Sequence, residues 1–163
     1  MPKVMSAEEA VRTYIQDGAT VAFGGFVGAM VPEEVNKTIQ ELYLSTGSPK
    51  ELTAIYAAGQ GDSDQRGLNH LGEAGLVSRV IGGHWGLVPR LQKLALENKL
   101  AAYNYPQGVI SQLFRDIAAG KPGLITHVGL KTFVDPELEG GMLNEKAREA
   151  GPLVERITIN GET

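Results

Sequence analysis

Short apolar runs alternate with stripes of apolar residues at helical spacing along most of this chain. The runs lie at residues 20–23, 52–58, 77–81, 101–104 and 124–127. Between the first two runs, Val35, Ile39 and Leu42 mark one face of a helix. Strands that alternate with helices in this way are typical of βαβ units. We therefore predict an α/β fold: an open, mostly parallel sheet of five strands with flanking helices.

Local signals predict where the first two helices begin and end. Ser6 and Glu9 have capping-box spacing, in which each side chain satisfies the backbone N–H of the other residue. Pro32 suits the first turn of the second helix, because its missing N–H would have no intrahelical acceptor there. Gly47 is expected to end that helix.

Glycines follow the first predicted strand, where open α/β sheets place their ligands. Gly24, Gly25 and Gly28 match neither the dinucleotide-binding nor the P-loop spacing. A phosphate would also meet the carboxylates of Glu33 and Glu34 in the next helical turn. Two interpretations remain: a backbone that approaches an uncharged or thioester-like group, and a tight turn without a ligand.

The same segment resembles the N-terminal signature of the family I coenzyme A transferases, which move coenzyme A (CoA) between carboxylic acids. That signature combines Asp/Asn-Gly, three apolar residues, Gly-Gly-Phe and a later Gly-x-Pro. The matches here are Asp17-Gly18, Val21-Ala22-Phe23, Gly24-Gly25-Phe26 and Pro32. Met30 stands where the signature has glycine, which leaves the backbone conformation just before the helix open.

Later segments follow the order of the acyl-CoA:acetate and 3-ketoacid branch of that family, so the resemblance covers most of residues 17–141. They are Ile81–His84, Ala102–Gly108, Gly120–Thr126, Val128–Pro136 and Gly140-Gly141. The resemblance implies a CoA-transferase-like fold. It also implies transfer of CoA between a short-chain or 3-keto acyl-CoA and a free carboxylic acid, with coenzyme A as a substrate and no permanently bound cofactor.

In the resembled family, a glutamate carboxylate attacks the acyl-CoA thioester, and a glutamyl-CoA intermediate forms. That glutamate belongs to a C-terminal, β-type domain or subunit, in a Ser-Glu-Asn-Gly type setting, and no such motif occurs here. Because covalent catalysis needs its nucleophile, we expect this chain to supply only one wall of the site. The resemblance thus implies a partner that carries the glutamate, within a homo- or hetero-oligomer.

The segment Tyr105-Pro106-Gln107-Gly108 follows the fourth predicted strand and begins a helix. The N–H groups of Gln107 and Gly108 lack intrahelical acceptors there and can polarise a carbonyl group. Ordinary capping of the helix explains the same residues. The family resemblance favours a site. It implies an oxyanion-type contact at Gln107 and substrate contacts at Gly24, Gly25, Phe26, Tyr105 and Gly108.

Charge and hydropathy narrow the range of partners. The net charge is −4 and basic residues do not cluster, which disfavours a nucleic-acid partner. Apolar stretches are too short to span a membrane, and Met1–Ser6 lacks the apolar core of a signal peptide. We therefore predict a cytoplasmic protein without a membrane partner.

Metal and thiol chemistry have little support in the sequence. There is no cysteine, and the three histidines, His70, His84 and His127, share no metal-ligand spacing. We expect no metal site. His84 alone has a site-like context, since it follows Gly83 at a predicted strand end, although a structural role is favoured for it.

The C-terminal residues 154–159 alternate like a strand, and Asn160-Gly161 is a hairpin-turn signal. No second strand follows this turn within the sequence. We therefore expect residues 1–163 to form one N-terminal domain that is incomplete at its C-terminus, and that associates or is mobile after about residue 150.

Two other functions remain open on the sequence. A sugar-phosphate isomerase of related architecture would need a basic phosphate clamp, for which Arg66, Lys121 and Lys131 lie near predicted loops. A non-catalytic subunit or fragment that only associates with a partner fits the missing glutamate.

Overall fold

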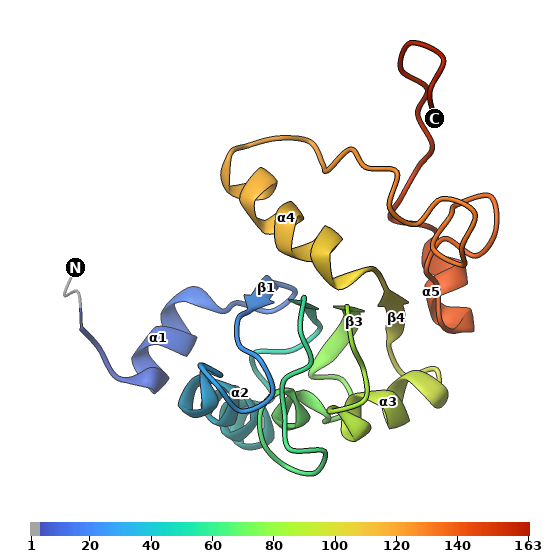
Figure 1. Ribbon diagram of the computed structural model, residues 1–163. Helices are drawn as coiled ribbons and strands as arrows, with labels where there is room; N and C mark the ends of the chain where they lie inside the picture. The colour runs from blue at the N-terminus through green and yellow to red at the C-terminus, as the bar shows by residue number, and fades with distance from the viewer. Residues whose placement is uncertain (1–3) are drawn as a thin grey trace.

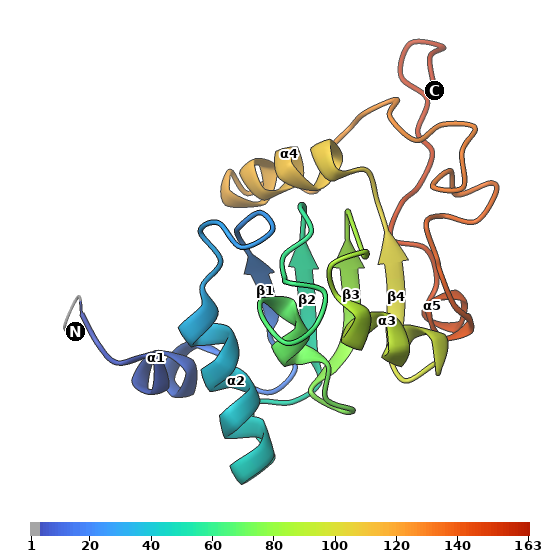
Figure 2. The same ribbon diagram turned by 60° about the horizontal axis from the view of Figure 1, so that its bottom comes forward.

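A parallel sheet forms the centre of the computed structural model, which describes residues 4–163 (Figure 1). Among these residues the sheet has four strands in the order β1-β2-β3-β4. They are β1 (Thr20–Phe23), β2 (Leu52–Tyr56), β3 (Val77–Gly82) and β4 (Ala101–Asn104). All three neighbouring pairs are parallel. The carboxyl ends of the strands therefore lie along one edge of the sheet (Figure 2).

Helices cover both faces of this sheet (Figure 1). One face carries α1 (Ala7–Tyr14), α2 (Glu33–Thr46), the 3₁₀ helix η1 (Leu68–Leu71) and α3 (Pro89–Leu96). The other face carries α4 (Gln107–Ala118) and α5 (Glu145–Ala150). This arrangement confirms the predicted α/β fold with a parallel sheet and flanking helices.

Side chains of β4 alternate between two clusters of buried apolar residues, one on each face of the sheet. Ala102 belongs to the cluster beneath α2 and α3, whereas Ala101 and Tyr103 belong to the cluster beneath α4 and α5. Successive strand residues point to opposite faces of a sheet. A strand buried on both faces is therefore apolar at consecutive positions, as the short apolar runs of the sequence indicated.

The predicted helix ends are close to those observed. Ser6 Oγ accepts a hydrogen bond from the Glu9 N–H at 3.2 Å, and the Glu9 carboxylate accepts one from the Ser6 N–H at 2.9 Å, which confirms the capping box. Gly47 ends α2 in the left-handed conformation, with φ of 78°. Pro32 caps α2 from just outside the helix, one position earlier than predicted.

The prediction of a fifth strand at residues 124–127 was wrong. The free edge of β4 is instead paired antiparallel with a later segment, since Tyr103 and Met142 form a bridge. The Asn104 N–H donates to the Gly141 carbonyl, and the Leu143 N–H donates to the Ala102 carbonyl, each at 2.9 Å. Residues 124–127 thus have no strand neighbour and form an irregular segment.

The C-terminal turn was predicted correctly, but the strand before it was not. Ile159 and Glu162 form an antiparallel bridge around Asn160 and Gly161, both of which have positive φ, as a type I′ turn requires. Residues 154–158 are irregular. The expected incompleteness of the domain stays a prediction.

Part of the N-terminal segment considered above, residues 1–3, lies outside the described residues. Within the described part of the chain, every helix is too short or too polar to cross a bilayer. The cytoplasmic location stays a prediction.

Candidate functional site

Loops rich in glycine follow all four strands at the carboxyl edge of the sheet (Figure 2). We call these loops the carboxyl rim and define it as residues 24–31, 57–61, 83–87 and 105–108. Open α/β sheets bind ligands outside the carboxyl ends of their strands. The glycine-rich loops after the four strands therefore lie along the edge at which such sheets bind ligands.

Backbone hydrogen bonds join the first two loops of the rim. The Val27 N–H donates to the Gly59 carbonyl at 2.7 Å, and the Gly61 N–H donates to the Val27 carbonyl at 2.9 Å. Beneath them, the buried Gln60 amide donates to the Phe23 carbonyl at 2.8 Å. The loop after β1 is therefore held against the loop after β2.

The loop after β1 contains strained backbone. Val27 has φ of 56° and Met30 has φ of 57°. This left-handed region is unfavourable for residues other than glycine, most of all for a β-branched one. The Met30 backbone thus adopts a glycine-like conformation at the position where the family signature has glycine, which answers the question that the sequence left open.

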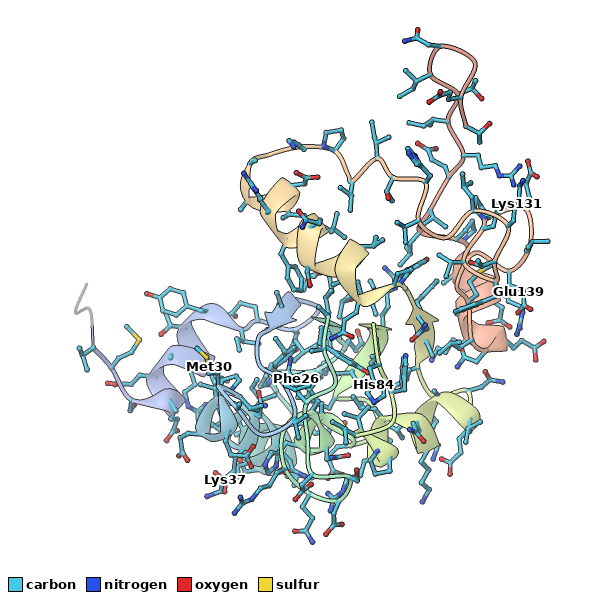
Figure 3. All side chains as sticks on the ribbon, viewed as in Figure 1. Phe26, Met30, Lys37, His84, Lys131 and Glu139 are labelled. Carbon is cyan, nitrogen blue, oxygen red and sulfur yellow. The ribbon has the colours of Figure 1, made fainter. Side chains whose placement is uncertain are left out.

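Apolar side chains project from the same loop. Phe26 is 62% exposed and Met30 is 94% exposed (Figure 3). Strained conformations cluster at ligand sites, where the surrounding structure holds them in place. The loop therefore presents an apolar, preformed surface at the rim.

Gln107 is the first residue of α4 and lies beside the end of β3. A Cβ atom on Gly83 would lie 3.0 Å from the Gln107 Cα atom, so the two backbones touch. The first N–H groups of a helix have no intrahelical acceptor, and those of Gln107 and Gly108 donate to no other described residue. Two free donors therefore stand at the rim.

The side chain of Tyr105 points away from these donors. It is buried, its hydroxyl donates to the Gly140 carbonyl at 2.9 Å, and its ring stacks on Tyr103 at a centroid distance of 6.3 Å. Burial raises the pKa of the Tyr105 phenol to about 12. The side chain therefore anchors the rim to the C-terminal segment.

His84 follows Gly83 on the rim, and its ring lies between two glycines. A Cβ atom on Gly59 would lie 2.4 Å from His84 Cδ2, and one on Gly86 would lie 3.0 Å from His84 Nε2. Neither ring nitrogen is hydrogen-bonded to another of the residues that the structure describes. His84 is exposed.

The acidic side chains near the rim are engaged by the protein. Glu33 accepts hydrogen bonds from the Gly67 N–H at 2.8 Å and lies 2.9 Å from His70 Nε2. Burial alone would raise the pKa of Glu33, but the hydrogen bonds from His70 and Gly67 lower it overall. The Asp62 carboxylate accepts three backbone N–H groups, and the bond from Arg66 contributes most to lowering its pKa.

The three cations considered for a phosphate clamp do not act as one group. Lys121 pairs with Asp116 at 2.7 Å, and Lys131 lies far from Phe26 in Figure 3. Within residues 4–163, acidic and histidine side chains do not gather in threes that would hold a metal ion. The rim therefore offers N–H donors, an imidazole and apolar side chains.

The family model of the coenzyme A transferases matches residues 4–163. The chain belongs to the coenzyme A transferase family. Among its relatives are the acetate CoA-transferase YdiF of Escherichia coli (strain K12), which is 44% identical over 147 residues, and the caffeate CoA-transferase of Acetobacterium woodii, which is 45% identical over 162 residues. These alignments cover 90% and 99% of this chain.

A solved structure agrees with this membership. The Escherichia coli O157:H7 acyl-CoA transferase YdiF, in a thioester complex with CoA, superposes with a TM-score of 0.90 at 40% sequence identity over 96% of this chain. The chain spans 28% to 30% of the length of these coenzyme A transferases.

The sequence did not predict that two glycines of the rim make room for neighbouring residues. Gly59 leaves room for the His84 ring, and Gly83 leaves room for the Gln107 backbone. The signal was present, because glycine allows close approach of two chain segments. However, the neighbours that each glycine admits come from other strands, and a single sequence does not name them.

Proposed function

We propose that this chain forms one wall of the active site of an enzyme that moves CoA between a short-chain or 3-keto acyl-CoA and a free carboxylic acid. Family membership supports the reaction class. The observation that carries the site is the pair of free N–H donors at Gln107 and Gly108, held on the rim by contact with Gly83.

In this proposal, the thioester carbonyl of the acyl-CoA lies against the Gln107 and Gly108 N–H groups. Negative charge develops on the carbonyl oxygen when a nucleophile attacks, and donors that are already oriented stabilise it. The backbone of Gly24 and Gly25 lies on the same rim, and Phe26 presents an exposed ring to the acyl or pantetheine chain.

The nucleophile is proposed to be a glutamate of a β-type domain or subunit outside this chain, which forms a glutamyl-CoA intermediate. Glu33 and Asp62, the acids described beside the rim, are hydrogen-bonded to other residues of the chain. Neither is free to attack a thioester.

An apolar hollow supports the presence of a partner. It has a volume of about 1330 Å³ and lies between α4 and the segments that follow it. Exposed apolar side chains line it: Ile117, Ile125, Ile157 and Ile159. This hollow is larger than most small-molecule pockets, and exposed apolar patches mark interaction surfaces.

Transfer assays on two proteins test this function. Residues 1–163 alone are expected to exchange no CoA between acetyl-CoA and free acids, because they lack the nucleophile. The assembled enzyme, with the partner domain or subunit, is expected to exchange CoA with ping-pong kinetics. Exchange by the isolated chain above a buffer blank contradicts the proposal, and so does an assembled enzyme that only associates.

A further inference from the structure

His84 differs from His70 in what its ring nitrogens contact. Both nitrogens of His70 are engaged, at 2.7 Å from Gln40 Oε1 and 2.9 Å from Glu33 Oε1. Those of His84 have no hydrogen-bond partner among the described residues, and the ring is exposed at the rim. Its nitrogens are therefore available to a ligand.

The His84 ring packs beside two glycines and makes no hydrogen bond to the described residues. Gly59 and Gly86 leave space on two sides of it, and a Cβ atom on either would meet ring atoms at 2.4 Å and 3.0 Å respectively. Leu87 Cδ1 also lies beside Gly59. The imidazole thus lies beside these glycines, and its ring nitrogens make no hydrogen bond to the described residues.

The position of His84 is central to the rim. Gly59, which its ring covers, accepts a hydrogen bond from the Val27 N–H at 2.7 Å. Gly83, its neighbour in sequence, contacts Gln107. His84 therefore stands between the Phe26 loop and the start of α4.

We propose that His84 binds the carboxylate of the free acid substrate, an inference that rests on the proposed transfer reaction. Imidazole carries at least one N–H donor in either protonation state, and two when charged. The other candidate site residues are glycine, phenylalanine, tyrosine and glutamine, none of which can carry a positive charge. His84 is thus the side chain of the candidate site best suited to an anionic substrate.

The test uses the assembled enzyme and measures KM separately for the free acid and for the acyl-CoA. His84→Ala is expected to raise the KM for the acid roughly 10- to 100-fold, the range for a lost hydrogen bond to a charged group. The KM for the acyl-CoA is expected to stay within about twofold. His84→Gln, which keeps an N–H donor, is expected to recover part of the loss.

Two further variants test whether the position of the His84 imidazole matters, and not only its presence. Gly59→Ala keeps the imidazole but places a methyl group where the ring lies, and its φ is compatible with alanine. It is expected to raise the KM for the acid as His84→Ala does. Gln112→Ala replaces an exposed side chain that lies outside both the rim and the apolar hollow, and it controls for a surface substitution as such.

Comparing inhibition by acetate and by its neutral analogue acetamide tests whether His84 recognises the negative charge of the acid. In the wild-type enzyme, acetate is expected to compete better than acetamide, and His84→Ala is expected to remove that preference. Equal acid KM values for wild type and His84→Ala overturn this inference alone. A rise in the KM for acyl-CoA instead, or an equal rise in both KM values with a lowered Tm, overturns it as well. A wild-type enzyme without transfer overturns the proposed function and this inference together.

Discussion

The backbone of Gln107 packs against Gly83 so closely that a Cβ atom on Gly83 would lie 3.0 Å from the Gln107 Cα atom. The same Cβ atom would lie 2.2 Å from the Ala57 carbonyl oxygen. Both neighbours are backbone, which cannot move aside as a flexible side chain can. The end of β3 therefore sets the position of the first turn of α4.

This contact predicts the effect of Gly83→Ala. The methyl group must push the loop after β2 and the start of α4 apart, and overpacking of this kind costs about 1–3 kcal/mol. Urea unfolding of the chain measures it. Gly123→Ala is the matched control, because its Cβ atom would meet open space at an ordinary φ. Equal unfolding midpoints for the two variants contradict the role of Gly83.

Substitutions at Gln107 test the proposed oxyanion contact. Gln107→Pro removes the N–H donor, and proline is tolerated at the first position of a helix. The preceding residue, Pro106, already has an extended ψ of 131°, as a residue before proline requires. In the assembled enzyme, kcat is expected to fall about 10²–10³-fold.

Gln107→Ala is the matched control, since it keeps the backbone donor and removes the exposed side chain. Little change in kcat is expected for it, whereas a large loss assigns the contact to the side-chain amide. Circular dichroism checks that both variants fold. If both turn over like the wild type, the segment is only a helix cap, and the site assignment at Gln107 is wrong.

Met30→Gly is expected to stabilise the fold modestly. A left-handed residue other than glycine costs roughly 1–2 kcal/mol, whereas glycine loses about 0.5–1 kcal/mol more in conformational entropy on folding. The net gain is therefore about 0–1.5 kcal/mol, because Met30 is exposed and has little packing to lose. Thermal unfolding measures it, and a lower Tm for the variant rules out relief of strain at this position.

The Asn144 side chain joins α5 to the sheet. Its Oδ1 atom accepts from the N–H groups of Ala102 and Ala147, at 3.1 Å and 3.0 Å, and its amide donates to the carbonyls of Ala95 and Leu100, both at 2.8 Å. Asn144→Ala leaves these groups unpaired. It is expected to cost about 2–4 kcal/mol of unfolding free energy.

Urea unfolding measures this loss. The exposed Gln112→Ala is the control, for which a change within about 0.5 kcal/mol is expected. A loss for Asn144→Ala no larger than that of the control shows that water replaces the four bonds without cost.

The lowered pKa of Asp135 predicts how the unfolding free energy of the chain depends on pH. Hydrogen bonds, first from the Arg156 side chain and then from the Lys131 N–H, lower the pKa of this carboxyl from 3.8 to about 2. Because the folded-state pKa is the lower one, the stabilisation is present above about pH 3.8 and disappears as the pH falls towards about 2. Asp135→Asn is expected to weaken this dependence.

Unfolding in urea at about pH 6 and about pH 2.5 provides the measurement. The wild-type chain is expected to lose more stability between the two values than Asp135→Asn does. The exposed Glu149 supplies the control variant Glu149→Gln. An equal acid-induced loss in wild type and Asp135→Asn excludes Asp135 as its source.

Much of the secondary structure was predictable because its causes are local. The capping box joins Ser6 and Glu9, only one helical turn apart. Strands β2 and β4 are mostly apolar runs that are buried on both faces, and that burial depends on their own residues. The location of the candidate site at the strand ends was also predictable, since parallel strands end at one edge.

The contacts within the candidate site were not predictable from local pattern. The approach of Gly59 to His84 and of Gly83 to Gln107 depends on strand order and register, which place loops from different strands side by side. The burial of Tyr105 depends likewise on Gly140, from a segment far along the chain.

By itself, the sequence determined the class of fold, the order of the first four strands with the helices between them, and the strand ends at which glycines gather. Backbone sterics and side-chain burial act over a few residues. The tertiary structure alone decided which segment pairs with β4. Residues 124–127 are apolar enough for a strand, but the free edge of β4 accepts one neighbour, and residues 141–143 occupy it. A strand needs a hydrogen-bonding partner, and only the assembled fold assigns one.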